Sequence, residues 1–208
     1  MAQATSRLTA RVFPQHEPFR VELLIDGRSV AARSRAVFQR TNPITGEVVT
    51  IAAAAGADDV DDAGCAAAAA FSNWSVTPAE TRAAILLLAK TRLQERADEI
   101  AHIMSLETGG TLDWCHFNVD LAARILEQAA LLAGEVSRPG LPAEMKETGS
   151  FVVRQPAGVC LAIAPWNAPI VLGVRSFAFA IAWGNTVILK TSELCPATQR
   201  MLGDIMAE

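Results

Sequence analysis

The sequence predicts an α/β fold built around a parallel sheet that these 208 residues leave incomplete. Two apolar segments, 158–164 and 185–190, are typical of strands buried on both faces, and an apolar segment of helical length, 170–183, separates them. With 51% hydrophobic and 19% charged residues, the chain can bury a substantial core. A parallel sheet needs more than two strands, so we expect a piece of a longer protein or a truncated gene product.

The first part, residues 1–56, is predicted to be a small β region. Residues 21–25 lead into Asp26-Gly27, which is a strong signal for a two-residue hairpin turn. A second pair of short strands is expected around residues 37–38 and 48–49, because the Asn-Pro-Ile-Thr-Gly segment between them, 42–46, has the composition of a turn.

Residues 57–135 are predicted to be a helical layer. Asp58 or Asp59 can cap a first helix that runs to about Phe71. A second helix is expected to begin at Pro78, where Thr77 and Glu80 match a capping box.

The later boundaries follow from glycine and proline. We expect the second helix to continue to Leu106 before Gly109-Gly110 ends it, and a further helix to span 112–132. Residues 136–155 are predicted to be a linker, with an arm strand over 151–154. The segment 156–208 is then the first strand–helix–strand unit of the sheet, followed by a helix that begins near Pro196 and is still running at Glu208.

Composition excludes several classes of protein. The net charge of −4 provides no surplus of basic residues for a nucleic acid. Four scattered cysteines without a Cys-x-x-Cys pair, and three histidines, argue against a metal site and favour reduced thiols in a cytoplasmic protein. The charge-free stretch 155–174 contains three prolines and two glycines, so buried sheet elements explain it better than a membrane span.

Polar residues follow both predicted buried strands. In open α/β sheets, ligands bind beyond the carboxyl ends of the strands. Asn167 follows the first strand and offers an NH₂ donor for a developing oxyanion. Lys190 and Glu193 follow the second strand and can together bracket a sugar diol. The alternatives are a turn residue before a helix for Asn167, and a solvated ion pair for Lys190 and Glu193.

Several blocks of the sequence resemble the aldehyde dehydrogenase superfamily. The chain matches it in order and spacing from about residue 21 to residue 208, and the combination of blocks is much more specific than any single one. The blocks are Asn-Pro-Ile-Thr-Gly-Glu at 42–47, Leu-Glu-Thr-Gly at 106–109, Pro-Trp-Asn at 165–167, Gly-Asn-Thr-Val at 184–187 and Lys-Thr-Ser-Glu at 190–193.

The resemblance implies an N-terminal part of a Rossmann-like NAD-binding domain, and it implies roles for particular residues. Asn167 matches the side chain that helps to form the oxyanion hole, and Lys190 and Glu193 match the pair that holds the adenine ribose of NAD, with NADP less favoured. Thr191 stands where many members have proline. The residues matching the lining of the cofactor cleft are Ile163, Ala164, Pro165 and Trp166.

The resemblance also implies that the catalytic domain is absent. In the family, the thiol nucleophile and the general-base glutamate come later in the chain, and neither has a counterpart here. Cys160 and Cys195 lie outside the family's nucleophile motif, and we expect them to be small buried residues. The 208-residue chain is therefore predicted to be inactive alone and to be part of a homodimer or homotetramer when complete.

Residues near Trp114 look most like members that oxidise aromatic aldehydes such as salicylaldehyde and vanillin. Trp114, Phe117 and Arg175 are candidates for the substrate tunnel. The two aromatic residues can equally belong to the core. Arg175, eight residues after Asn167, can face a phenolic oxygen or form an ion pair with a carboxylate. An aliphatic semialdehyde dehydrogenase and a truncated, non-catalytic nucleotide-binding homologue remain alternatives.

Overall fold

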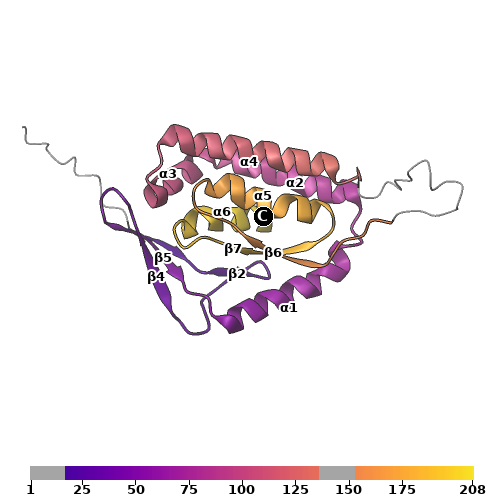
Figure 1. Ribbon diagram of the computed structural model, residues 1–208, viewed down its shortest axis with the longest axis horizontal. Helices are drawn as coiled ribbons and strands as arrows, with labels where there is room; N and C mark the ends of the chain where they lie inside the picture. Colours follow the sequence, from indigo (N-terminus) through magenta and orange to yellow (C-terminus); the bar gives the residue numbers. More distant parts are fainter. Residues whose placement is uncertain (1–16, 136–152) are drawn as a thin grey trace, which may run out of the picture.

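A computed structural model describes residues 17–135 and 153–208, which form a layered α/β structure (Figure 1). The strands are β1 (Phe19–Val21), β2 (Leu23–Ile25), β3 (Arg28–Val30), β4 (Val37–Thr41), β5 (Val48–Ala53), β6 (Val159–Ile163) and β7 (Thr186–Lys190). The helices are α1 (Ala57–Trp74), α2 (Ala79–Glu95), α3 (Ala97–Thr108), α4 (Leu112–Leu132), α5 (Pro169–Ala182) and α6 (Pro196–Ala207).

The β region contains both predicted hairpins. β2 and β3 pair antiparallel around Asp26-Gly27, and both turn residues have positive φ angles, 53° and 69°. This backbone matches a turn whose twist suits a hairpin, which explains the Asp-Gly pair. β4 and β5 pair antiparallel across the predicted turn, and β1 adds a parallel strand to the other edge of β5.

Two predicted helix starts are wrong in detail. Gly56 is the N-cap of α1, and the carboxylate of Asp59 accepts a hydrogen bond from the Gly56 N–H at 2.8 Å. Pro78 is the N-cap of α2 and no side chain caps that helix. The hydroxyl of Thr77 instead donates to the Asn73 carbonyl at 2.9 Å, so it stabilises the end of α1.

The long second helix that we expected is two helices. Arg96 leaves the helical conformation, with φ −101° and ψ 16°, and separates α2 from α3. Its guanidinium binds the Glu99 carboxylate, with Nε and Oε2 2.9 Å apart, at the start of α3. The apolar periodicity of the sequence continues through this break, so the pattern did not predict the break. Gly109, at φ 75°, ends α3 as predicted.

The last part of the chain forms a parallel β6–α5–β7 unit followed by α6, as predicted. Helix α1 packs on one side of the two strands, α5 lies on the other, and α2, α3 and α4 form an outer layer (Figure 1). One expectation is corrected, because neither strand is buried on both faces: the residues of β7 are half-buried or exposed, and most of those in β6 are too. Leu161 and Ile163, which lie on the same face of the strand, are 64% and 67% exposed, so no described element covers that face at these positions.

The predicted linker and arm strand fall mostly outside the described residues. Residues 136–152 are not described, and Val153 and Arg154, the last two residues of the expected strand, are not in a strand. Within the described ranges, no helix has both the length and the apolar character that a membrane span requires.

Close packing between α5 and α6 brings α6 beneath the ends of the strands. A Cβ atom added to Gly173 would clash with the end of the buried Leu202 side chain unless that side chain moved, so glycine favours the close approach of the two helices. The largest buried side chains around this crossing come from several helices and form one core. Among them are Leu86, Leu93, Ile100, Met104, Leu126, Ile170 and Val174.

Candidate active site

The two predicted site loops lie side by side at the carboxyl ends of the parallel strands. In the β6–β7 register Ile163 pairs with Lys190, the last residue of each strand. Beyond them, the Ala164 N–H donates to the Lys190 carbonyl at 3.1 Å. The loop that carries Asn167 therefore starts next to the loop that carries Glu193.

The loop after β6 begins with a buried residue and then exposes its side chains to solvent. Ala164 is buried, whereas Pro165, Trp166 and Asn167 are exposed. Within the described part of the chain, no hydrogen bond is made by the Asn167 amide. Its NH₂ group can therefore donate to an incoming oxygen atom.

The loop after β7 carries a loose ion pair. Nζ of Lys190 lies 3.6 Å from Oε2 of Glu193, and both side chains are more than half exposed. The pKa of the Glu193 carboxyl is lowered, because its own backbone N–H donates to it and Lys190 is close. The pair thus offers a cation that donates hydrogen bonds next to an ionised acceptor, which suits a vicinal diol.

The side chain of Gln199, on α6, connects the two loops from below and was missed by the sequence analysis. It is 1% exposed. Its Oε1 accepts from the Ser192 N–H at 2.7 Å, and its Nε2 donates to the carbonyls of Pro165 and Pro169 at 3.1 and 3.2 Å. A polar residue on the buried side of an amphipathic helix was the one signal available.

Glu107, at the end of α3, is a second buried polar side chain that binds backbone groups, in this case at the N-terminus of α6. Its carboxylate is fully buried and accepts four hydrogen bonds of 2.7–2.9 Å, from the Thr50 hydroxyl, the Ala197 N–H, and the N–H and hydroxyl of Thr198. Burial raises the pKa of this carboxyl, and the donated hydrogen bonds oppose that rise. A carboxylate at this position also complements the dipole of α6.

None of the cysteines nearest this site is arranged as a nucleophile. Cys195 is buried, and burial raises the pKa of its thiol to about 12. Cys160 is half-buried within β6, which corrects the expectation that it is fully buried. Because the thiolate is the reactive form, the Cys195 position disfavours catalysis. In the part of the chain that the structure describes, no cluster of three or more acidic, histidine or cysteine residues can hold a metal.

The tunnel candidates are on the surface rather than in the core. Trp114 and Phe117 on α4 are 43% and 51% exposed and stack on each other, with ring centroids 5.6 Å apart and planes at 22°. Arg175 on α5 is exposed as well. These residues therefore present an aromatic pair and a cation to whatever approaches the two helices.

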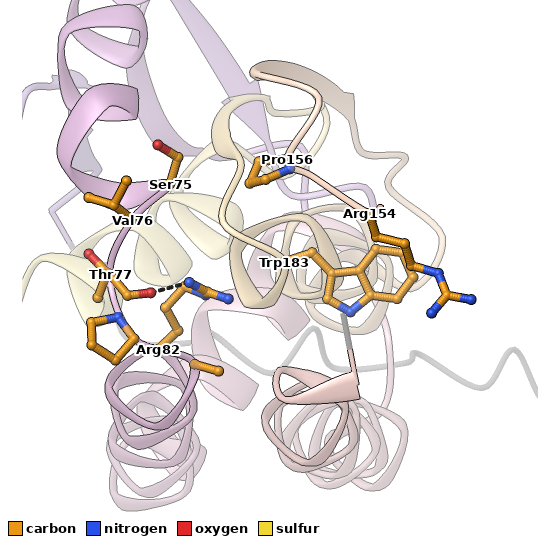
Figure 2. A pocket seen from close by; sticks show the side chains of 9 residues that line it. Ser75, Val76, Thr77, Arg82, Arg154, Pro156 and Trp183 are labelled. Carbon is orange, nitrogen blue, oxygen red and sulfur yellow. Dashed lines mark hydrogen bonds between the residues drawn. The ribbon is translucent and has the colours of Figure 1, made fainter. Parts of the chain in front are cut away.

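A separate cleft of about 280 Å³ lies at the opposite, amino end of the strands (Figure 2). Trp183 and Pro156 line one side, and Arg82 lines the other. The Arg82 guanidinium is already hydrogen-bonded within the protein, because it donates to the carbonyls of Thr77 and Ala182. Since the loops with Asn167 and Glu193 do not border this cleft, it is distinct from the candidate site.

A parallel βαβ unit with exposed polar side chains beyond both strands is typical of the α/β proteins that bind ligands at that edge. A sequence model of the aldehyde dehydrogenase family matches residues 30–208, so the chain belongs to that family. A vanillin dehydrogenase from Pseudomonas sp. strain HR199 is 44% identical over 188 residues, which are 90% of this chain and 39% of that enzyme. The chain thus spans about 39% of the length of this curated relative.

Solved structures agree with this assignment. A salicylaldehyde dehydrogenase from Pseudomonas putida G7, complexed with salicylaldehyde, has a TM-score of 0.86 and 31% identity over 90% of this chain and 39% of that one. Aldehyde dehydrogenase C from Pseudomonas syringae, a mutant in complex with NAD⁺ and octanal, has a TM-score of 0.82 and 35% identity over 89% of this chain and 38% of that one.

Proposed function

We propose that this chain is the N-terminal part of an NAD-dependent aldehyde dehydrogenase that oxidises an aromatic aldehyde to its carboxylic acid. The observation that carries the proposal is the juxtaposition of the exposed Asn167 with the Lys190–Glu193 pair on neighbouring strand-end loops. The 44% identity with a vanillin dehydrogenase supports the aromatic substrate class.

The two loops divide the binding of NAD between them. Lys190 donates to the adenine ribose hydroxyls and Glu193 accepts from them, while the residues from Ile163 to Trp166 line the cofactor cleft. A 2′-phosphate would meet the ionised Glu193, so NAD is preferred over NADP. The bound nicotinamide supplies the hydride acceptor for the reaction. The positions of the proposed cleft residues fit this role, because they are next to the pair in the β6–β7 register.

Asn167 acts on the reacting aldehyde. Addition of a cysteine thiolate to the carbonyl carbon forms a thiohemiacetal and moves negative charge onto the carbonyl oxygen. The Asn167 NH₂ group donates a hydrogen bond to that oxygen and stabilises the charge. Loss of hydride gives a thioester, which an activated water hydrolyses to the acid. The thiolate and the base that activates water match no residue of this chain, so the 208 residues alone do not turn over.

The substrate path is proposed to run past Trp114, Phe117 and Arg175. The stacked aromatic pair offers a flat apolar surface that suits an aromatic ring. The exposed Arg175 is available to a phenolic oxygen of the substrate or to a carboxylate from another segment. An aliphatic aldehyde is the second candidate substrate, favoured by the likeness to the dehydrogenase structure that contains octanal.

The organisation of the chain follows the same proposal. Residues 1–56 form the β region, 57–135 the helical layer, 136–155 the linker and arm strand, and 156–208 the first βαβ unit of the cofactor sheet. We propose a cytoplasmic enzyme that assembles as a homodimer or homotetramer.

The test compares this chain with a completed enzyme, defined as the full product of its gene or, if the gene ends at Glu208, a chimera completed with the vanillin dehydrogenase. We expect the completed enzyme to form NADH with vanillin, salicylaldehyde and benzaldehyde, and to do so less efficiently with octanal. The 208-residue chain should form none above the no-enzyme control. Equal or better efficiency with octanal would contradict the aromatic assignment, and no NADH with any aldehyde would contradict the activity itself.

A further inference from the structure

The Gln199 side chain directly connects the two site loops. Its amide makes three hydrogen bonds to backbone groups: one in the loop after β7, one in the loop after β6, and one at Pro169, the first residue of α5. The two carbonyl acceptors, Pro165 and Pro169, flank Asn167 in sequence. The N–H donor, Ser192, lies between Lys190 and Glu193.

The partners define which way the amide points. Two carbonyl oxygens face Nε2 and one N–H group faces Oε1, so a reversed amide would set its oxygen against both carbonyls. The position of α6 relative to the two loops is itself fixed, because Glu107 binds the first turn of α6 and Gly173 allows its close contact with α5. The amide is therefore held rigidly by the packing around it.

We propose that Gln199 is a positioning residue that fixes the Asn167 loop relative to the Lys190–Glu193 loop. The inference rests on the proposed function, in which these loops hold the reacting carbonyl and the cofactor. A displacement of about 1 Å between reacting groups can cost on the order of 10²-fold in rate. Gln199 thus acts on catalysis through the two backbones that it connects, without touching the substrate.

The chain provides a matched control at the other end of the same strands. Asn185 is also a buried amide, 7% exposed, with three hydrogen bonds to backbone groups. Its Oδ1 accepts from the N–H groups of Ala157 and Gly158, and its Nδ2 donates to the Ala180 carbonyl. A variant at Asn185 removes the same kind of contact from the same unit, but away from the proposed site.

Two substitutions separate the two connections of Gln199. Gln199→Glu keeps the oxygen that accepts from Ser192 but loses the NH₂ group that donates to the Pro165 and Pro169 carbonyls. Gln199→Met removes all three hydrogen bonds with little change in volume. In the completed enzyme, we expect Gln199→Glu to lower kcat about 10- to 100-fold with the Michaelis constant for NAD within about threefold. Gln199→Met should lower kcat and also raise that Michaelis constant.

The pH profile gives a readout that general destabilisation does not. A carboxyl group facing carbonyl oxygens is favoured in its neutral form, in which it can donate one hydrogen bond. The kcat of Gln199→Glu, relative to the unsubstituted enzyme at the same pH, should therefore recover as the pH falls. Asn185→Leu should lower the unfolding temperature while kcat and the Michaelis constant for NAD stay near those of the unsubstituted enzyme.

Hydrogen exchange tests the connection independently of activity. In the 208-residue chain, the Ser192 amide should lose protection in Gln199→Met and keep it in Gln199→Glu and Asn185→Leu. If the methionine variant does not fold, Gln199→Asn, whose shorter side chain cannot reach both loops, replaces it with the same expectation. Kinetics unchanged in both Gln199 variants, or changed equally by Asn185→Leu, would overturn the inference. Failure of the proposed function would instead appear as an inactive unsubstituted enzyme with the exchange pattern intact.

Discussion

At the amino end of the β6–β7 pair, Asn185 joins the start of β6 to the end of α5, and at the carboxyl end Gln199 joins the two loops that leave the strands. Both residues use a buried amide with hydrogen bonds to backbone groups. The difference lies in what surrounds each amide. At the carboxyl end, Asn167, Lys190 and Glu193 remain exposed above the held backbone.

Around the amino end, the polar side chains of Trp74, Arg82 and Thr186 hydrogen-bond to backbone carbonyls and hold the fold. The indole N–H of Trp74 donates to the Ile181 carbonyl at 3.1 Å, and Nε of Arg82 donates to the Ala182 carbonyl at 2.9 Å. The Thr186 hydroxyl donates to the Ala67 carbonyl at 2.8 Å. The comparison indicates that the candidate site combines two features. Its loop backbones are fixed by a buried side chain, and its own polar side chains are exposed to solvent.

The largest expected effect comes from removing one of these free side chains. In the completed enzyme, Asn167→Ala should lower kcat about 10²–10³-fold with a modest change in the Michaelis constant for NAD, because an oxyanion donor acts on the transition state. The matched control is Asn73→Ala, another exposed amide near the amino end of the unit, which should keep its turnover. Near-native turnover of Asn167→Ala, with chemistry shown to be rate-limiting, would mean that Asn167 is only a turn residue and not an oxyanion donor.

The next effect concerns stability and compares two of the buried charged residues that bind backbone groups at helix ends, Glu107 and Arg82. Glu107→Leu leaves four buried donors without their acceptor, and we expect it to lower the free energy of unfolding by about 3 kcal/mol or more, at 1–3 kcal/mol per unsatisfied buried group. Arg82→Met leaves two carbonyl acceptors without a donor, those of Thr77 and Ala182, which is fewer groups than Glu107→Leu leaves, and should cost about 1–2 kcal/mol. Urea unfolding of the 208-residue chain measures both, and an Arg82→Met cost equal to that of Glu107→Leu would contradict the ranking.

The sequence predicted well those turns and helix ends that depend on local signals. The Asp26-Gly27 hairpin was confirmed, and so was the end of α3 at Gly109, since turn and cap residues act on their immediate neighbours. The break at Arg96 was missed, because no glycine or proline marks it. The exposure of Leu161 was missed for a different reason: an apolar run predicts a buried strand but does not say what covers it.

The exposed side chains of the candidate site were found from the sequence, whereas the buried ones beneath them were not. Asn167, Lys190 and Glu193 follow predicted strands, and their family blocks lie in short segments. Gln199 and Glu107 depend on contacts that span up to 34 and 91 residues. Long-range hydrogen bonds of this kind have no local pattern, so they became visible only in the folded chain.

The smallest expected effect tests a single charge at the carboxyl end. Glu193→Gln in the completed enzyme should raise the efficiency with NADP relative to NAD about fivefold, because like charges in contact near the surface cost on the order of 1 kcal/mol. The lowered pKa of Glu193 keeps the carboxyl ionised at neutral pH, so the repulsion is present there. Salt should reduce the difference, since the pair is exposed. Glu47→Gln, which removes an exposed carboxylate from the β4–β5 turn, is the control, and a cofactor ratio that is the same in both variants would show that Glu193 does not meet the ribose.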